Sequence, residues 1–181
     1  MKKEYDSIKE LIADNLDTKE HGPTTKLIHQ LKSVRGRGYF TKTEFLRMGM
    51  WKSPRPKPRY MSNSEKDIIN ISKKMLSTKF EKRKIELLTK LNGVDIPVAS
   101  AILMLLNPER YGVIDIRVWK TLYLYGSVKV KKSGANFNFR NWYSYLMRIR
   151  YYAKLFKVKA RDIERTIFFY HSEIQEGKLY G

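Results

Sequence analysis

The sequence contains no cysteine, which excludes disulfides, thiolate zinc sites, iron–sulfur clusters and thiol nucleophiles. Its three histidines, His21, His29 and His171, are too far apart in the sequence to suggest a metal-binding cluster. We therefore expect no metal site and no other cofactor.

Long apolar runs are also missing. No stretch approaches the roughly 20 apolar residues that a membrane-spanning helix needs. Residues 1–10 are charged, and no apolar segment of the kind found in signal peptides follows them. We expect no membrane partner, a monomer, and a cytoplasmic location in association with the nucleoid.

Acidic residues are few, with 18 Asp and Glu against 37 Lys and Arg, and the formal net charge is +19. The excess of basic residues lies in two zones, 22–60 and 111–181, on either side of a more neutral middle. Both zones contain clusters in which cations alternate with aromatic residues: Arg35, Arg37, Tyr39 and Phe40; Trp51, Lys52, Arg55, Lys57, Arg59 and Tyr60; Arg140, Trp142, Tyr143, Arg148, Arg150, Tyr151 and Tyr152. Such clusters are either solvated helix faces beside core aromatics, or surfaces that neutralise phosphates and stack on bases. Together with the net charge they indicate a nucleic-acid partner, and we expect double-stranded DNA.

Apolar residues recur at helical spacing along most of the chain. The pattern predicts helices over 11–16, over 27–34 with an end at Gly36, and over 68–76, 85–91, 138–156 and 160–175. Thr41 to Glu44 and Ser62 to Glu65 have the pattern of a capping box at a helix start. The expected class is all-α, a two-lobed helical bundle, in which only residues 126–139 leave room for one short β-hairpin.

A proline-rich segment interrupts the helical pattern. Pro54, Pro56 and Pro58 alternate with Ser53, Arg55 and Lys57, a spacing that predicts an extended basic strap without helix. The strap divides the chain into residues 1–60, with N-terminal helices and the strap itself, and residues 61–181, a helical core. The two parts either fold separately or pack as one domain.

Residues 85–125 have the pattern of a helix-hairpin-helix motif. A helix ends at Leu91, a tight turn Asn92-Gly93-Val94 follows, and a second helix starts near Ile96-Pro97. Gly after one helix and Pro at the start of the next are also ordinary caps. In a hairpin, however, such a turn directs free amides at a DNA phosphate. The residues expected to contact DNA are Asn92, Gly93, Val94 and Ile96 of the hairpin and the cations Lys52, Arg55, Lys90 and Arg117.

A single carboxylate, Asp115, follows the second helix at the end of the apolar segment Val113-Ile114. This arrangement resembles the helix-hairpin-helix DNA glycosylase superfamily. In that superfamily the hairpin is similar to L-P-G-V-G-x-K-T-A, and the essential Asp lies eighteen residues after the Lys. Here Pro97 occupies the Lys position and Asp115 lies eighteen residues further on. The resemblance covers about residues 85–125, extends more loosely over the two C-terminal helices, and implies that Asp115 is the catalytic residue.

The chain departs from the family pattern at three points, each with a consequence. Because Pro97 replaces the lysine that forms a Schiff base, the resemblance implies a monofunctional glycosylase without lyase activity by that route. Asp95 replaces the second glycine of the hairpin and adds a negative charge beside the expected phosphate. Some relatives carry a cysteine-ligated iron–sulfur cluster, whereas this chain without cysteine would be a cluster-free member.

The resemblance also implies that a target base is swung out of the duplex into an aromatic pocket. The candidates for this pocket are Trp51, Tyr111, Trp119 and Trp142, each of which is otherwise a core residue. The expected function is that of a monofunctional DNA base-excision glycosylase. The alternatives are a non-catalytic helix-hairpin-helix protein that holds DNA, a base-excising defence or restriction protein, and an RNA-binding protein. A structural role for Asp115 as a helix N-cap is compatible with each of them.

Overall fold

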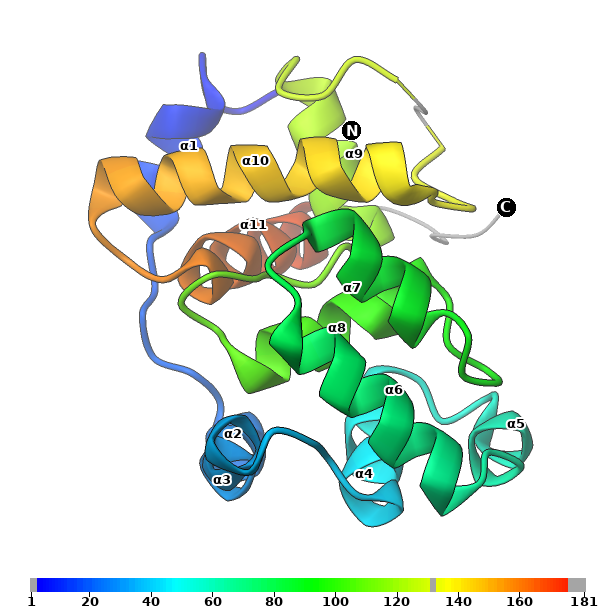
Figure 1. Ribbon diagram of the computed structural model, residues 1–181. Helices are drawn as coiled ribbons and strands as arrows, with labels where there is room; N and C mark the ends of the chain where they lie inside the picture. Colours follow the sequence, from blue (N-terminus) through cyan, green and yellow to red (C-terminus); the bar gives the residue numbers. More distant parts are fainter. Residues whose placement is uncertain (1–2, 131–132, 176–181) are drawn as a thin grey trace. The chain divides into compact units, whose positions relative to one another are not determined.

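The computed structural model describes residues 3–130 and 133–175, and in this part of the chain it contains helices and no strand. The helices are α1 (Ile8–Asn15), α2 (Gly22–Gln30), α3 (Lys32–Arg37), α4 (Lys42–Lys52), α5 (Lys57–Met61), α6 (Glu65–Ser77), α7 (Glu81–Leu88), α8 (Ile96–Leu106), α9 (Ile116–Leu124), α10 (Phe139–Phe156) and α11 (Ala160–Ile174) (Figure 1). The predicted all-α class is confirmed.

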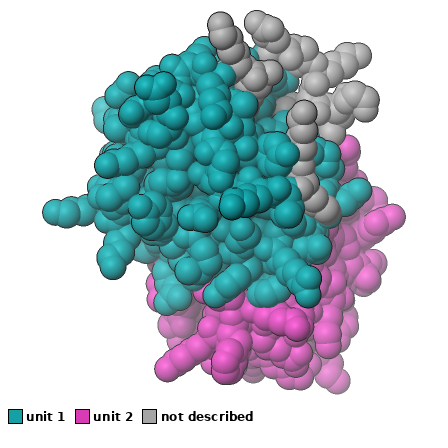
Figure 2. All heavy atoms as spheres, turned by 90° about the horizontal axis from the view of Figure 1, so that it is seen from above, with its two compact units in different colours: residues 1–19, 108–181 teal, residues 20–107 magenta. Residues whose placement is uncertain are grey.

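Two compact units make up the chain (Figure 2). One consists of residues 1–19 and 108–181, and the other of residues 20–107. We call them the Asp115 unit and the hairpin unit, after the candidate residues that each contains. Their boundaries differ from the division at residue 60 that the proline-rich segment suggests, because residues 20–60 belong to the same unit as residues 61–107.

Helix α8 is the centre of the hairpin unit. Every residue from Val98 to Leu106 is buried, and α2, α3, α4 and α7 all contact this helix. A helix that is apolar on all sides requires neighbours all around it. The hairpin at its N-terminus is therefore attached to the most buried element of its unit.

In the Asp115 unit, α11 is the element that contacts most of the other helices. It packs against α1, α9 and α10, and Figure 1 shows the long helix α10 lying along it. The segment that leads into α9, from Tyr111 to Ile114, is buried throughout. Asp115 thus follows a fixed stretch of backbone.

The possible β-hairpin over 126–139 is not found, since the described residues from 126 to 138 form turns and loop and α10 begins at Phe139. The reason is visible at Gly134, where a β-carbon would lie 3.1 Å from Cγ1 of Ile116 and 3.3 Å from Cδ1 of Trp119. The loop is shaped by packing on the start of α9 rather than by pairing with itself. Residues 131–132 lie outside the described part of the chain.

The prediction of an extended strap over the proline-rich segment is wrong. Residues 54–57 form a turn, in which the Lys57 N–H donates to the Pro54 carbonyl at 3.2 Å. Pro58 lies in the first turn of α5, which begins at Lys57, and Pro56 precedes that helix as its N-cap. Proline is tolerated there because the first amides of a helix have no partner within the helix.

Two of the local helix predictions also need correction. The helix expected over 27–34 begins earlier, at Gly22, and is interrupted at Leu31, where α2 ends and α3 begins. The N-cap of α6 is Ser64, whose hydroxyl accepts from the Asp67 N–H, and not Ser62. By contrast, the capping box of Thr41 and Glu44 is confirmed in both directions.

Candidate functional site

The predicted hairpin consists of α7, a tight turn and α8. Gly93 has φ +85°, a left-handed conformation that glycine adopts at little cost. Asp95 is the N-cap of α8 and accepts the Val98 N–H at 2.9 Å through Oδ1. The residue that replaces the second glycine of the family pattern therefore has a defined role in starting the second helix.

Asn63, in the turn between α5 and α6, is hydrogen-bonded through its side chain to the backbone of the hairpin turn. Its Oδ1 accepts the Asn92 N–H at 2.7 Å, and its Nδ2 donates to the Asn92 carbonyl at 3.0 Å. The Val94 N–H donates to the Leu91 carbonyl at 3.1 Å. The backbone N–H groups of Asn92 and Val94 thus have partners inside the protein, and the contact of these two residues with DNA stays a prediction.

Two of the hairpin residues predicted to contact DNA, Gly93 and Ile96, have backbone N–H groups that are available to a ligand. Within the described residues, the backbone N–H groups of Gly93 and Ile96 have no hydrogen-bond acceptor. Both belong to residues that are partly exposed. A phosphate that approached the hairpin would meet these two amides close to the Asp95 carboxylate.

Tyr60 supports the turn from within the unit. It is fully buried, and a β-carbon at Gly93 would lie 2.8 Å from its ring Cδ1. Burial, with a smaller contribution from the Asp95 charge, raises the pKa of Tyr60 to about 12. The phenol thus stays neutral, and glycine is required at position 93 both by φ and by space.

The predicted DNA-binding cations of the hairpin unit differ in their exposure to solvent. Lys90 and Arg55 are exposed, in the turns that follow α7 and α4, while Lys52 is half-buried at the end of α4. Trp51, beside it, is half-buried and donates from Nε1 to the Thr24 hydroxyl at 3.1 Å. Its indole is thereby fixed against α2.

Asp115 lies in the other unit and is the N-cap of α9. Its Oδ1 accepts the Arg117 N–H at 3.0 Å, and the residue is partly exposed. The positive end of the helix dipole favours an ionised carboxylate at this position. Asp115 therefore fulfils the N-cap role at a partly exposed position.

The charges of Asp115, Arg117 and Lys120 all act on the side chain of His171. We call these four residues the Asp115 cluster. The Arg117 guanidinium lies over the Phe168 ring at 5.1 Å, and its Nε is buried without a hydrogen-bond partner in the described structure. Arg117, predicted to contact DNA, is half-buried. Its guanidinium is thus held against α11.

His171, from α11, is the buried member of the cluster. Its Nδ1 has no hydrogen-bond partner among the described residues. Burial lowers the pKa of His171, the charges of Arg117 and Lys120 lower it further, and the charge of Asp115 acts in the opposite direction. The imidazole is therefore neutral near pH 7. Neither His171 nor Lys120 is among the residues predicted from the sequence for this site.

Tyr145 fixes the backbone that leads to Asp115. It is fully buried, and its hydroxyl donates to the Val113 carbonyl at 2.8 Å. Burial first, then the charges of Glu164 and Asp115, raise the pKa of Tyr145 well above its usual value, against an opposing effect of Arg161. Its proton is thus retained in the hydrogen bond that positions the segment before Asp115.

The structure does not agree with the predicted aromatic pocket. Trp119 and Trp142 are fully buried, with their rings against Phe137 and Phe139 at 5.2 and 5.9 Å between centroids. Tyr111 is buried as well, under the Arg150 guanidinium at 5.0 Å. These three rings are core residues of the Asp115 unit, and a flipped base has no access to them. Of the four candidates only Trp51 is partly exposed.

In the described part of the chain, no group of three or more acidic or histidine side chains has the arrangement of a metal site. None of the described helices is long and apolar enough to cross a membrane. No family model, no curated protein and no solved structure matches this chain.

Proposed function

We propose that this chain binds double-stranded DNA and hydrolyses the N-glycosidic bond of a base that has been swung out of the duplex, with Asp115 as the catalytic carboxylate. The observation that carries the proposal is the position of Asp115: it is a partly exposed residue that caps the N-terminus of α9, at the end of a buried segment. Its spacing of eighteen residues from Pro97 matches the glycosylase pattern.

The chemistry requires a carboxylate that is ionised and held in place. As the base departs, positive charge develops on the deoxyribose C1′, and a fixed negative charge nearby stabilises it. The same group can orient the attacking water or accept its proton. The Arg117 N–H and the dipole of α9 favour the ionised form of Asp115.

The net charge of +19 supports the choice of partner. Cations that neutralise phosphates release the counterions of DNA, which supplies most of the affinity for a duplex of any sequence. Hairpin amides such as those of Gly93 and Ile96 contact the backbone in a way that does not depend on sequence.

The test is excision from duplexes that carry uracil, 8-oxoguanine, an alkylated base or a mispair, with alkali used to reveal the abasic product. We expect the parent chain to act on at least one of them and Asp115→Asn to lose this activity while retaining DNA affinity. Since Asn is as good an N-cap as Asp, this variant removes the charge and preserves the start of α9. Equal excision by the parent chain and by Asp115→Asn would overturn the assignment.

Asp115→Ala is the matched control for the structural role. It removes the N-cap and should lower the free energy of unfolding by about 1 kcal/mol, whereas Asp115→Asn should leave it nearly unchanged. Loss of excision in both variants, with loss of stability in Ala alone, separates catalysis from capping.

A second candidate function is DNA binding without chemistry. The observations that favour it are the complete N-cap role of Asp115 and the buried position of Trp119 and Trp142. It predicts salt-sensitive binding to duplex DNA, no excision of any base, and equal affinity in the parent chain and in Asp115→Asn.

A further inference from the structure

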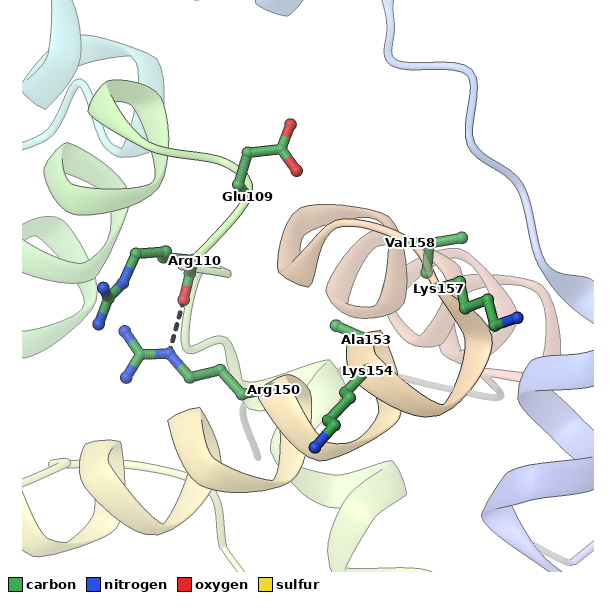
Figure 3. A pocket seen from close by; sticks show the side chains of 7 residues that line it. All are labelled: Glu109, Arg110, Arg150, Ala153, Lys154, Lys157 and Val158. Carbon is green, nitrogen blue, oxygen red and sulfur yellow. Dashed lines mark hydrogen bonds between the residues drawn. The ribbon is translucent and has the colours of Figure 1, made fainter.

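An open depression in the Asp115 unit gathers positive charge around the C-terminal end of α10 (Figure 3). It has a volume of about 450 Å³. Its lining residues are Glu109, Arg110, Arg150, Ala153, Lys154, Lys157 and Val158. We call it the α10 depression. Four of these side chains are cations and one is a carboxylate, so the surface is strongly positive.

The one carboxylate among the lining residues of the depression, Glu109, is paired with a lysine of the same surface. Glu109 Oε1 lies 3.4 Å from Nζ of Lys159, which follows the depression at the start of α11. Both side chains are more than half exposed, and an exposed ion pair of this kind is weak and easily rearranged. It does not cancel the charge of the remaining cations.

Arg150 is held in place by its neighbours. Its Nε donates to the Arg110 carbonyl at 2.9 Å, and its guanidinium lies over the Tyr111 ring at 5.0 Å. In Figure 3 the guanidinium groups of Arg110 and Arg150 lie near each other, and both point away from Val158 and Lys157. A planar guanidinium that is held in advance loses little entropy when it binds phosphate.

Lys157 adds an independent observation. It ends α10 with φ 56° and ψ 40°, a left-handed conformation that is costly for a residue with a β-carbon and is usually taken by glycine at this position. A lysine retained in such a conformation places an exposed ammonium on the rim of the depression. Strain of this kind is typical of functional positions.

We propose that the α10 depression is a second DNA-contacting surface, which binds phosphates of the duplex backbone. The proposal rests on the proposed function only in its choice of partner. An enclosed pocket with donors on all sides would fit a free phosphate or a nucleotide. This depression is open and is lined by exposed lysines and a held arginine, which suits a continuous strand that passes across it.

The experiment measures the affinity of the full-length chain for a fluorescent duplex by anisotropy at increasing salt concentration. The variants are Lys157→Gly and Lys154→Gln, and the control is Lys9→Gln, which removes an exposed lysine of α1 in the same unit. We expect each depression variant to bind several-fold more weakly than the control and to lower the log–log salt slope by about 0.9. Lys157→Gly is expected to melt at the same or a higher temperature, since it relieves the left-handed strain.

Two outcomes would overturn the proposal. One is equal affinity and equal salt slope in the depression variants and in Lys9→Gln. The other is binding of inorganic pyrophosphate by the parent chain that Lys157→Gly abolishes while duplex affinity stays at the control value, which would assign the depression to a small phosphate compound.

The catalytic proposal fails or succeeds separately. Its own variant is Asp115→Asn, which should bind the duplex with the affinity of the parent chain and excise nothing. If the parent chain excises no base, the affinity comparison still decides whether the α10 depression contacts DNA.

Discussion

The Asn63 side chain pairs with both backbone groups of Asn92, accepting its N–H at 2.7 Å and donating to its carbonyl at 3.0 Å. The same Nδ2 also donates to the carbonyls of Arg59 and Tyr60, at 3.1 and 3.0 Å. One buried amide thus joins the turn after α5 to the turn of the hairpin. The conformation of the hairpin depends on a residue that lies 29 positions earlier in the sequence.

Asn63→Ala should therefore destabilise the hairpin unit. The substitution leaves the Asn92 backbone groups and two carbonyls without their partner, and we expect the free energy of unfolding to fall by about 2 kcal/mol. Urea denaturation measures the change. The control is Asn70→Ala, an exposed position on α6, which should change stability by less than about 0.5 kcal/mol. Equal stability of the two variants would show that the pairing with Asn92 contributes nothing.

A second prediction concerns the space at Gly93. Gly38 and Gly93 have similar φ values, +81° and +85°, but a β-carbon would meet nothing within 4 Å at Gly38 and the Tyr60 ring at 2.8 Å at Gly93. Gly38→Ala should cost about 1 kcal/mol for its backbone conformation. Gly93→Ala should cost about 1–3 kcal/mol more, because the buried ring must move. Thermal unfolding of both variants measures the difference, and similar values would exclude the Tyr60 contact as its cause.

Local signals in the sequence explain how much of the fold could be predicted. The capping box at Thr41 and the helical spacing of apolar residues depend on neighbours within one turn of the chain, so both are visible in the sequence. Proline is allowed both in an extended segment and in the first turn of a helix, so Pro58 alone does not fix the start of α5. The loop at Gly134 depends on packing against Ile116 and Trp119. Such choices are made by distant contacts, which a single sequence does not contain.

The candidate site could be predicted in part for the same reason. The N-cap position of Asp115 is a local feature, and it is found as expected. Trp142 could have been assigned to the core, because it precedes Tyr145 and Ile149 by three and seven residues on one helix face, and these are buried too. The position of His171 beside α9 results from the packing of two helices, and no signal in the sequence points to it.

The stability of the chain should depend on pH through His171. Because burial and the charges of Arg117 and Lys120 lower the pKa of His171 in the folded protein, the unfolded chain takes up a proton at a higher pH than the folded one. The neutral His171 side chain therefore makes its full contribution to stability above a pH of about 6.5, the usual pKa of histidine. This contribution is lost as the pH falls through that value towards the lower folded pKa, with a slope of at most about 1.4 kcal/mol per pH unit.

The measurement is the free energy of unfolding by urea between about pH 7.5 and 5, around the usual histidine pKa, for the parent chain and for His171→Leu, which replaces the imidazole with an apolar group of similar size. We expect a smaller decrease towards low pH in His171→Leu, because the group that must stay neutral in the fold is gone. His29→Leu, at an exposed position on α2, provides the matched control. If His171→Leu and the parent chain lost the same amount of stability over this range, the buried imidazole would not be the source of the pH dependence. Other titrating groups would then account for it.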